Sequence, residues 1–90
     1  MDGEISFDPV KRAMTLADRG LDFAEAGQVF DSRSKTVIDD RFDYGEVRYV
    51  TYGWLEQDAV AVVWTERDGG CRVISMRHMH QWEIRHVGLD

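Results

Sequence analysis

The sequence contains a single cysteine, Cys71, among its 90 residues, and this scarcity limits the classes of protein to which it can belong. One thiol cannot form an intrachain disulfide, so we expect a reducing compartment, the cytoplasm, rather than a disulfide-stabilised secreted scaffold. No second cysteine lies near Cys71, and nothing marks it as a nucleophile. We therefore interpret it as a small residue that fills space in a strand.

Long hydrophobic runs are also missing. The longest purely apolar run, residues 59–64, is far too short to span a bilayer. The first four residues, Met-Asp-Gly-Glu, lack the basic and apolar regions of a signal peptide, so we expect neither export nor membrane association. No repeat, low-complexity tract or linker divides the chain, and residues 1–90 are predicted to form one domain.

General catalytic motifs are absent as well: there is no Gly-rich phosphate loop, no Cys-x-x-Cys pair and no His-Glu-x-x-His sequence. Ser75 lacks the context of a nucleophile elbow and is interpreted as a strand-end or cap residue. His78 and His80 alternate as two metal ligands on one strand face would, but no third ligand is evident. We therefore expect no metal site and no cofactor.

The net charge of −6 argues against a protein that binds nucleic acid through bulk positive charge. The charge is unevenly distributed, however. Residues 67–87 hold four arginines against two acidic residues, and they include all three histidines. A local cationic site in this segment is compatible with an acidic protein.

Helical spacing is evident in the first third of the chain. Asp8 is a good N-cap and Pro9 suits the first helical position, while Gly20 is typical of a left-handed C-cap. The residues expected to form the buried stripe of this helix are Val10, Met14 and Ala17. A second helix begins at once, with Asp22 and Glu25 as a capping-box-like pair after Leu21. Its expected apolar face consists of Phe23, Ala26 and Phe30.

From residue 35 the hydrophobic period changes to two. Strands are predicted over residues 35–39, 46–54, 58–67 and 70–77, and the last two are joined by the hairpin turn Asp68-Gly69. The most apolar strand, 58–67, is expected at the centre of the sheet. The period of two therefore indicates an antiparallel sheet of about four strands.

A final helix is predicted over residues 78–87, with Met79, Trp82 and His86 on its apolar face. The fold class is therefore α+β: two N-terminal helices, the antiparallel sheet and a C-terminal helix. We expect the helices to cover one face of the sheet and to leave the other open for a site.

Arginines are spaced along the neighbouring predicted strands, at Arg48, Arg67, Arg72 and Arg77. Arginine binds phosphate through two parallel hydrogen bonds and stabilises charge that develops on a phosphoryl oxygen. The alternative is a solvated face on which each arginine pairs with an acidic neighbour such as Glu46, Glu66 or Asp43. Composition alone does not decide between them. The aromatic residues Tyr44, Tyr49, Tyr52, Trp54 and Trp64 are likewise either base-stacking platforms or, more commonly in half-buried strands, core.

An ordered set of residues extends over nearly the whole chain. It consists of Phe7-Asp8, Lys11, Arg19-Gly20, Phe23, Glu25-Ala26, Val29-Phe30, Asp39-Asp40, Gly45-Glu46, Arg48, Gly53, Val63, Thr65, Arg67, the block Arg72-Val73-Ile74-Ser75-Met76-Arg77, and Glu83. In this order they resemble the BrnT family of small toxins. Three features depart from that family: Arg19 replaces a usual histidine, His78 stands where lysine is common, and residues 81–90 are less basic.

The resemblance implies a RelE-like fold and a ribonuclease that stops translation by cleaving RNA. It also implies a BrnA-type antitoxin that binds the toxin, with DNA contacted only through the DNA-binding part of the antitoxin.

Metal-free RNA cleavage needs a base for the 2′-hydroxyl proton, cations for the phosphate and an acid for the leaving 5′ oxygen. For charge stabilisation we predict Arg67, Arg72 and Arg77. We predict Glu46 as the base and His78 as the acid, with His80 in reserve. The residues expected to contact RNA are Lys11, Arg19, Arg48 and His80. On this account Arg77→Ala would abolish toxicity and leave the thermal midpoint nearly unchanged.

Each of these roles has a structural alternative, since Glu46 is able to pair with Arg48 and His78 to cap the final helix. The function also has an alternative: a non-catalytic module of the same fold that serves only as partner and co-repressor of the antitoxin. The acidic composition and the weakly basic C-terminal segment favour this module. A free-standing enzyme acting on a small metabolite has no cofactor motif to support it.

Overall fold

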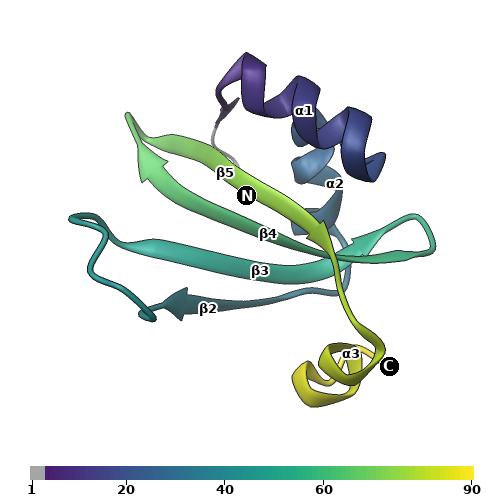
Figure 1. Ribbon diagram of the computed structural model, residues 1–90. Coiled ribbons are helices and arrows are strands. Elements are labelled where there is room, and N and C mark those ends of the chain that lie inside the picture. Colours follow the sequence, from purple (N-terminus) through teal and green to yellow (C-terminus); the bar gives the residue numbers. More distant parts are fainter. Residues whose placement is uncertain (1–3) are drawn as a thin grey trace.

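Five strands form one sheet, in the spatial order β1-β5-β4-β3-β2, in the computed structural model, which describes residues 4–90 (Figure 1). The elements are β1 (Ile5–Ser6), α1 (Pro9–Arg19), the 3-10 helix η1 (Phe23–Glu25), α2 (Ala26–Asp31), β2 (Lys35–Asp39), β3 (Arg48–Leu55), β4 (Asp58–Arg67), β5 (Gly70–His78) and α3 (Gln81–Val87). Residues 1–3, on which the expectation about a signal peptide partly rests, lie outside the described residues.

The predicted meander is confirmed, with β2, β3, β4 and β5 pairing antiparallel and β4 at the centre. Asp68 and Gly69 both adopt positive φ, at 55° and 77°, as the two-residue hairpin between β4 and β5 requires. The sheet has one strand more than the four expected, however, because β1 pairs with β5 in the parallel direction. A strand of two residues is too short to produce a recognisable period of two.

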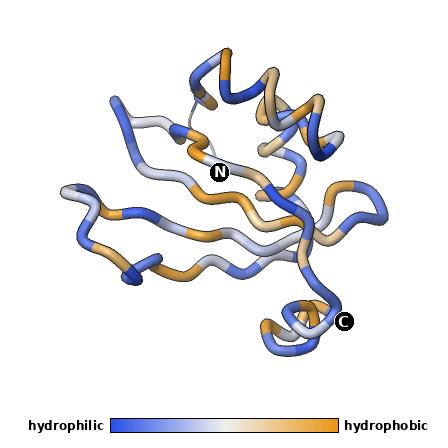
Figure 2. Tube along the Cα trace, in the orientation of Figure 1, coloured by the Kyte–Doolittle hydropathy of each residue, from blue (hydrophilic) through white to orange (hydrophobic). Residues whose placement is uncertain are grey.

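Helix α1 has the predicted ends but the wrong buried face. The Asp8 side chain accepts a hydrogen bond from the Val10 amide at 2.9 Å, and Gly20 ends the helix in the left-handed conformation. Contrary to the prediction, Val10 and Met14 are 66% and 60% exposed, and Ala17 is exposed as well. Figure 2 shows apolar positions recurring along α1. The exposure of Val10, Met14 and Ala17 shows that the rest of the chain does not cover this face.

Polar contacts hold α1 in place instead. The Arg12 guanidinium donates to both carboxylate oxygens of Asp22, at 2.7 and 2.9 Å. Nη1 of Arg19 donates to the Met76 carbonyl oxygen at 2.7 Å. Helical spacing identifies an apolar face, but it does not show that the face is turned toward the core.

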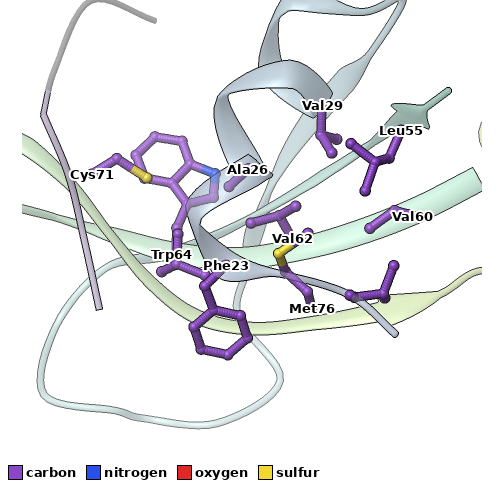
Figure 3. Packing of buried hydrophobic residues seen from close by; sticks show 11 residues of the cluster. Phe23, Ala26, Val29, Leu55, Val60, Val62, Trp64, Cys71 and Met76 are labelled. Carbon is purple, nitrogen blue, oxygen red and sulfur yellow. The ribbon is translucent and has the colours of Figure 1, made fainter. Parts of the chain in front are cut away.

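The main core lies between the sheet and the helical segment that follows α1 (Figure 3). Phe23 and Ala26 are fully buried, as predicted, and Phe30 packs edge-on against the Trp64 ring. Tyr49 stacks on Trp64 with ring centroids 4.6 Å apart, so these two aromatic residues are core rather than open platforms. Cys71 is buried in the same cluster, and burial raises the pKa of its thiol to about 12.

Helix α3 lies on the opposite side of the sheet from α1 and α2 (Figure 1). It begins at Gln81, because His78 still belongs to β5 and the Met79 amide continues the ladder to the Ala59 carbonyl at 2.9 Å. The expected apolar face is wrong: Trp82 and His86 are exposed, Met79 is buried but precedes the helix, and Ile84 and Val87 pack on the sheet instead. The prediction that all helices cover one face is therefore wrong.

Within residues 4–90, no helix has the length and hydropathy needed to cross a membrane.

Candidate functional site

A cleft of about 440 Å³ lies on the face of the sheet that α3 only partly covers. Cross-strand register places Arg77 of β5 opposite Ala61 of β4, and Ala61 opposite Tyr52 of β3, so the three share this face. The small Ala61 side chain leaves room between the longer two. The residues that line the cleft are Val37, Ile38, Asp39, Asp40, Arg41, Val50, Tyr52, Val63, Arg77, His80, Trp82 and Glu83.

Arg77 is fixed in the cleft by a carboxylate. Its Nη1 and Nη2 donate to Oε1 and Oε2 of Glu83, each at 2.8 Å, and the Glu83 side chain is only 8% exposed. Oε1 of Glu83 also accepts from the His80 amide at 2.9 Å. The hydrogen bonds from Arg77 are the main reason that the pKa of Glu83 falls to about 2, and the same pairing raises the pKa of Arg77. One buried carboxylate therefore positions both Arg77 and the backbone of His80.

A second arginine–carboxylate pair lies on another wall of the cleft. Nε and Nη2 of Arg41 donate to the two Asp39 oxygens at 2.8 and 2.9 Å, and the Tyr44 hydroxyl lies 3.2 Å from Oδ2. The Asp39 side chain is 2% exposed, whereas that of Arg41 is 67% exposed. Hydrogen bonds from Arg41 are the largest cause of the lowering of the Asp39 pKa to about 2, and the pair raises the pKa of Arg41.

Sequence reasoning missed Arg41. Its only signal was an Asp-x-Arg spacing at the end of a strand, which ordinary surface ion pairs share.

The cleft offers discrete hydrogen-bond donors rather than a strongly positive field. Asp39 and Glu83 neutralise the charges of Arg41 and Arg77, and the exposed Asp40 adds a negative charge. Each guanidinium has five N–H groups, and a carboxylate occupies only two of them. Arg41 and Arg77 therefore keep donors for a phosphate even though the ion pairs are neutral overall.

A second group of predicted site residues lies toward the other end of the same face. Glu46 bridges two arginines: its Oε2 lies 3.2 Å from Nε of Arg48 and its Oε1 lies 3.3 Å from Nη2 of Arg67. Arg67 and Arg72 line a second hollow of about 290 Å³. The structure therefore brings Glu46, Arg48, Arg67 and Arg72 together.

This second group is separate from the cleft. Arg77 pairs in register with Ala61, and Arg67 follows six residues later on the same strand, β4. At about 3.3 Å per residue, Arg67 and Arg77 are about 20 Å apart along the sheet. The structure does not bring Glu46 or Arg67 to the position of Arg77, and a single phosphate cannot contact both ends.

The remaining predicted residues lie on the side of the sheet that α1 and α2 cover, except for His80, which lines the cleft. His78 pairs in register with the core residue Val60, and its Nε2 lies 2.9 Å from the Arg19 carbonyl oxygen. Lys11 is exposed on α1. His78 is also not the cap of α3, because that position belongs to His80. The RNA contacts expected of Lys11 and Arg19, and the catalytic role expected of His78, stay predictions.

Two exposed or half-exposed aromatic side chains line the cleft, Tyr52 and Trp82. Tyr52 and Trp54 both pack with the cluster beneath α3, but Trp54 does not line the cleft. Among residues 4–90, no group of three or more His, Cys, Asp or Glu side chains is arranged to hold a metal ion.

The chain was compared with known proteins. A family model described as the ribonuclease toxin BrnT of type II toxin-antitoxin systems matches residues 7–83. Among curated proteins, none matches the chain. The family match includes both arginine–carboxylate pairs of the cleft.

Proposed function

Since the chain belongs to the BrnT family of ribonuclease toxins of type II toxin-antitoxin systems, we propose that it cleaves RNA in the cleft beside Arg77, without a metal ion, and thereby inhibits translation. One observation carries the proposal. Two arginines, each held by a buried carboxylate, and one histidine line the same cleft. These are the cations and the proton-exchanging group that metal-free phosphoryl transfer needs.

The reaction is a transesterification within the RNA. The 2′-hydroxyl oxygen forms a bond to the neighbouring phosphorus, and the bond from phosphorus to the 5′ oxygen breaks. The products are a 2′,3′-cyclic phosphate and a 5′-hydroxyl. The free N–H groups of Arg77 and Arg41 donate to the phosphoryl oxygens, on which negative charge grows in the transition state.

His80 supplies the proton to the leaving 5′ oxygen, because histidine is the side chain best suited to proton exchange near neutral pH. The base is chosen from three carboxylates that line the cleft. Asp39 and Glu83 are held in ion pairs that lower their pKa values to about 2, which makes both weak bases. Asp40 therefore takes the 2′-hydroxyl proton in this proposal.

Glu46, the base expected from sequence, pairs with Arg48 and Arg67, and Arg67 lies about 20 Å from Arg77 along the sheet. We assign this group, with Arg72, to the binding of RNA that extends beyond the cleft. An extended single strand of several nucleotides would reach from one group to the other.

The test is cleavage of a defined single-stranded RNA by the purified chain, with EDTA present. Arg77→Ala is a poor probe, because it would leave the buried Glu83 carboxylate unpaired and reduce stability. The double variant Arg77→Gln/Glu83→Gln replaces the ion pair with a neutral amide pair. We expect this variant to keep the circular dichroism spectrum of the parent and to cleave at least 100-fold more slowly. The exposed control Asp18→Asn should cleave as fast as the parent. Cleavage equal to the parent would contradict the proposal, and loss of parental cleavage with EDTA would contradict metal independence.

For the fold as a whole, we propose a RelE-like arrangement. For the partner, we propose a BrnA-type antitoxin that covers the exposed apolar face of α1. DNA would be contacted only through this antitoxin. Val10, Met14 and Ala17 are exposed on this face of the helix. Exposed apolar clusters mark protein contacts more often than nucleic-acid contacts.

The exposed helix face also favours the alternative function, a non-catalytic module that only binds the antitoxin. Expression in cells separates the two. A ribonuclease toxin would stop growth, the antitoxin would restore it, and Arg77→Gln/Glu83→Gln would be harmless but still bind the antitoxin. Harmless expression of the parent together with tight antitoxin binding would instead support the module. Val10→Ser/Met14→Ser should weaken antitoxin binding without affecting cleavage.

A further inference from the structure

Trp82 is the one tryptophan of three that the fold does not use for packing. Trp64 is buried and donates from Nε1 to Thr51 Oγ1 at 2.9 Å, and Trp54 packs with the cluster beneath α3. Trp82, on the first turn of α3, is 65% exposed and lines the cleft that contains Arg77. Single exposed hydrophobic side chains are common on protein surfaces, so what marks Trp82 is its place in the wall of the cleft that contains Arg77.

The neighbourhood of Trp82 is aromatic as well. Its ring is almost parallel to that of His80, with an interplanar angle of 7° and centroids 6.4 Å apart. The His86 ring also lies 6.4 Å from that of Trp82 between centroids, tilted by 58°. Tyr52 also lines the cleft. Flat π-faces beside phosphate-binding donors are the usual elements of single-strand recognition.

The charge of the cleft favours such a contact. The net charge is −6, and the arginines of the cleft are neutralised by Asp39 and Glu83. Release of counterions from neutralised phosphates therefore contributes little to RNA affinity. Stacking of bases on aromatic side chains does not depend on net charge, and a single stacked base changes affinity by about 5- to 150-fold.

We propose that Trp82, with His80 beside it, forms a stacking subsite for one unpaired nucleobase of the RNA, next to the phosphate held by Arg77. This inference rests on the proposed function, because it assigns the same cleft to RNA. It also specifies the substrate class. A base can stack on the exposed ring only when it is unpaired, so the cleft takes single-stranded RNA and rejects a duplex.

Glu83 fixes the geometry of this subsite. It accepts from Arg77 and from the His80 amide, and it is the immediate neighbour of Trp82 on α3. Through this one carboxylate, Arg77 on β5 is tied to the first turn of α3, which carries Trp82. In this proposal the phosphate and the base beside it are bound by Arg77 and Trp82, which Glu83 keeps at the same end of the cleft.

The experiment uses a short single-stranded RNA with 2′-O-methyl groups, which has no 2′-hydroxyl nucleophile and cannot be cleaved. The RNA is added stepwise to the parent, Trp82→Phe, Trp82→Ala and the α1 control Leu16→Ala, and tryptophan fluorescence is recorded. We expect quenching in the parent and the control, a 5- to 150-fold higher Kd in Trp82→Ala by a labelled-RNA assay, and near-parental affinity in Trp82→Phe. For an RNA too short to reach Arg48, Arg67 and Arg72, the slope of log K against log salt should be shallow, about −0.7 to −1.4, as for one or two phosphates.

Binding that is unchanged in Trp82→Ala would overturn the subsite, as would equal affinity for duplex RNA. Weaker antitoxin binding by Trp82→Ala, with RNA affinity unchanged, would assign the ring to the protein partner instead and also overturn it. Because the RNA cannot be cleaved, the titration is independent of catalysis. Failure of the parent to cleave unmodified RNA would refute the proposed activity, whereas tryptophan-dependent binding would still support the subsite.

Discussion

The ion pair between Arg77 and Glu83 makes the chain sensitive to acid in a way that one substitution tests. The pKa of Glu83 falls from an ordinary 4.5 to about 2. Each pH unit corresponds to about 1.4 kcal/mol, which gives an upper limit of about 3.4 kcal/mol for the stabilisation. The Arg77 side chain is 38% exposed, so solvent screening reduces the expected value to about 2 kcal/mol.

The pH dependence follows from the direction of the change. A folded-state pKa below the unfolded value contributes stability that is complete well above pH 4.5 and is lost as the pH falls toward 2. We expect Glu83→Gln to unfold about 10 °C below the parent at pH 7, because about 1 kcal/mol shifts the midpoint of a domain of this size by about 4–8 °C. At pH 3 the difference in free energy of unfolding should fall to less than about half of its value at pH 7.

Urea denaturation at pH 7 and pH 3, followed by circular dichroism, measures both differences. The matched control is Glu46→Gln, whose carboxylate pairs with Arg48 and Arg67 at longer distances and with more solvent exposure. We expect it to change the free energy of unfolding by less than about 0.5 kcal/mol at either pH. The reasoning would be refuted if Glu83→Gln were as stable as the parent at pH 7, or if the difference in free energy of unfolding between them stayed constant down to pH 3.

Three further predictions concern the core. Because burial raises the pKa of Cys71 to about 12, a colorimetric thiol reagent at pH 8 should react only after denaturant is added, and rapid labelling of the folded chain would contradict this. A Cβ on Gly53 would lie 2.9 Å from Cγ1 of Val29, so Gly53→Ala should lose about 1–3 kcal/mol in urea denaturation; unchanged stability would show that α2 moves freely. Thr51→Val removes the acceptor of the buried Trp64 Nε1–H and should lower the free energy of unfolding by about 1–3 kcal/mol, as measured by tryptophan fluorescence in urea. Unchanged stability would contradict this and show that another acceptor replaces Thr51.

Elements with strong local signals were predicted from the sequence. Strands 35–39 and 58–67 have the predicted bounds, because their β-branched and apolar residues, together with the Asp68-Gly69 turn, define them without help from the rest of the chain. The ends of α1 were predicted for the same reason, since Asp8 and Gly20 act within one helical turn.

What depended on distant contacts was not predictable. The direction of the apolar face of α1 is set by the contacts of Arg12 with Asp22 and of Arg19 with Met76, which no helical periodicity contains. The two-residue strand β1 exists only because β5 offers it an edge, where Ile5 pairs with Cys71.

The candidate site shows the same division. Arg77 and His80 were selected from sequence, and both line the cleft, but nothing local indicated that Glu83 holds the two together. Trp82 was assigned to a buried helix face because its spacing from Met79 is helical. The preceding segment is in fact extended, so that spacing does not apply. Arg41 lies 36 positions before Arg77, and only the folded sheet brings both to one cleft.

The central claim is that RNA binds on the open face of the sheet, beside Arg77 and α3. The most direct measurement is a titration of the isotopically labelled chain with a 2′-O-methyl single-stranded RNA, followed by amide chemical shifts. The account predicts the largest changes at residues 39–41, 77 and 80–83, with smaller ones near residues 46–48, 67 and 72. Changes confined to α1, on the other side of the sheet, would contradict it.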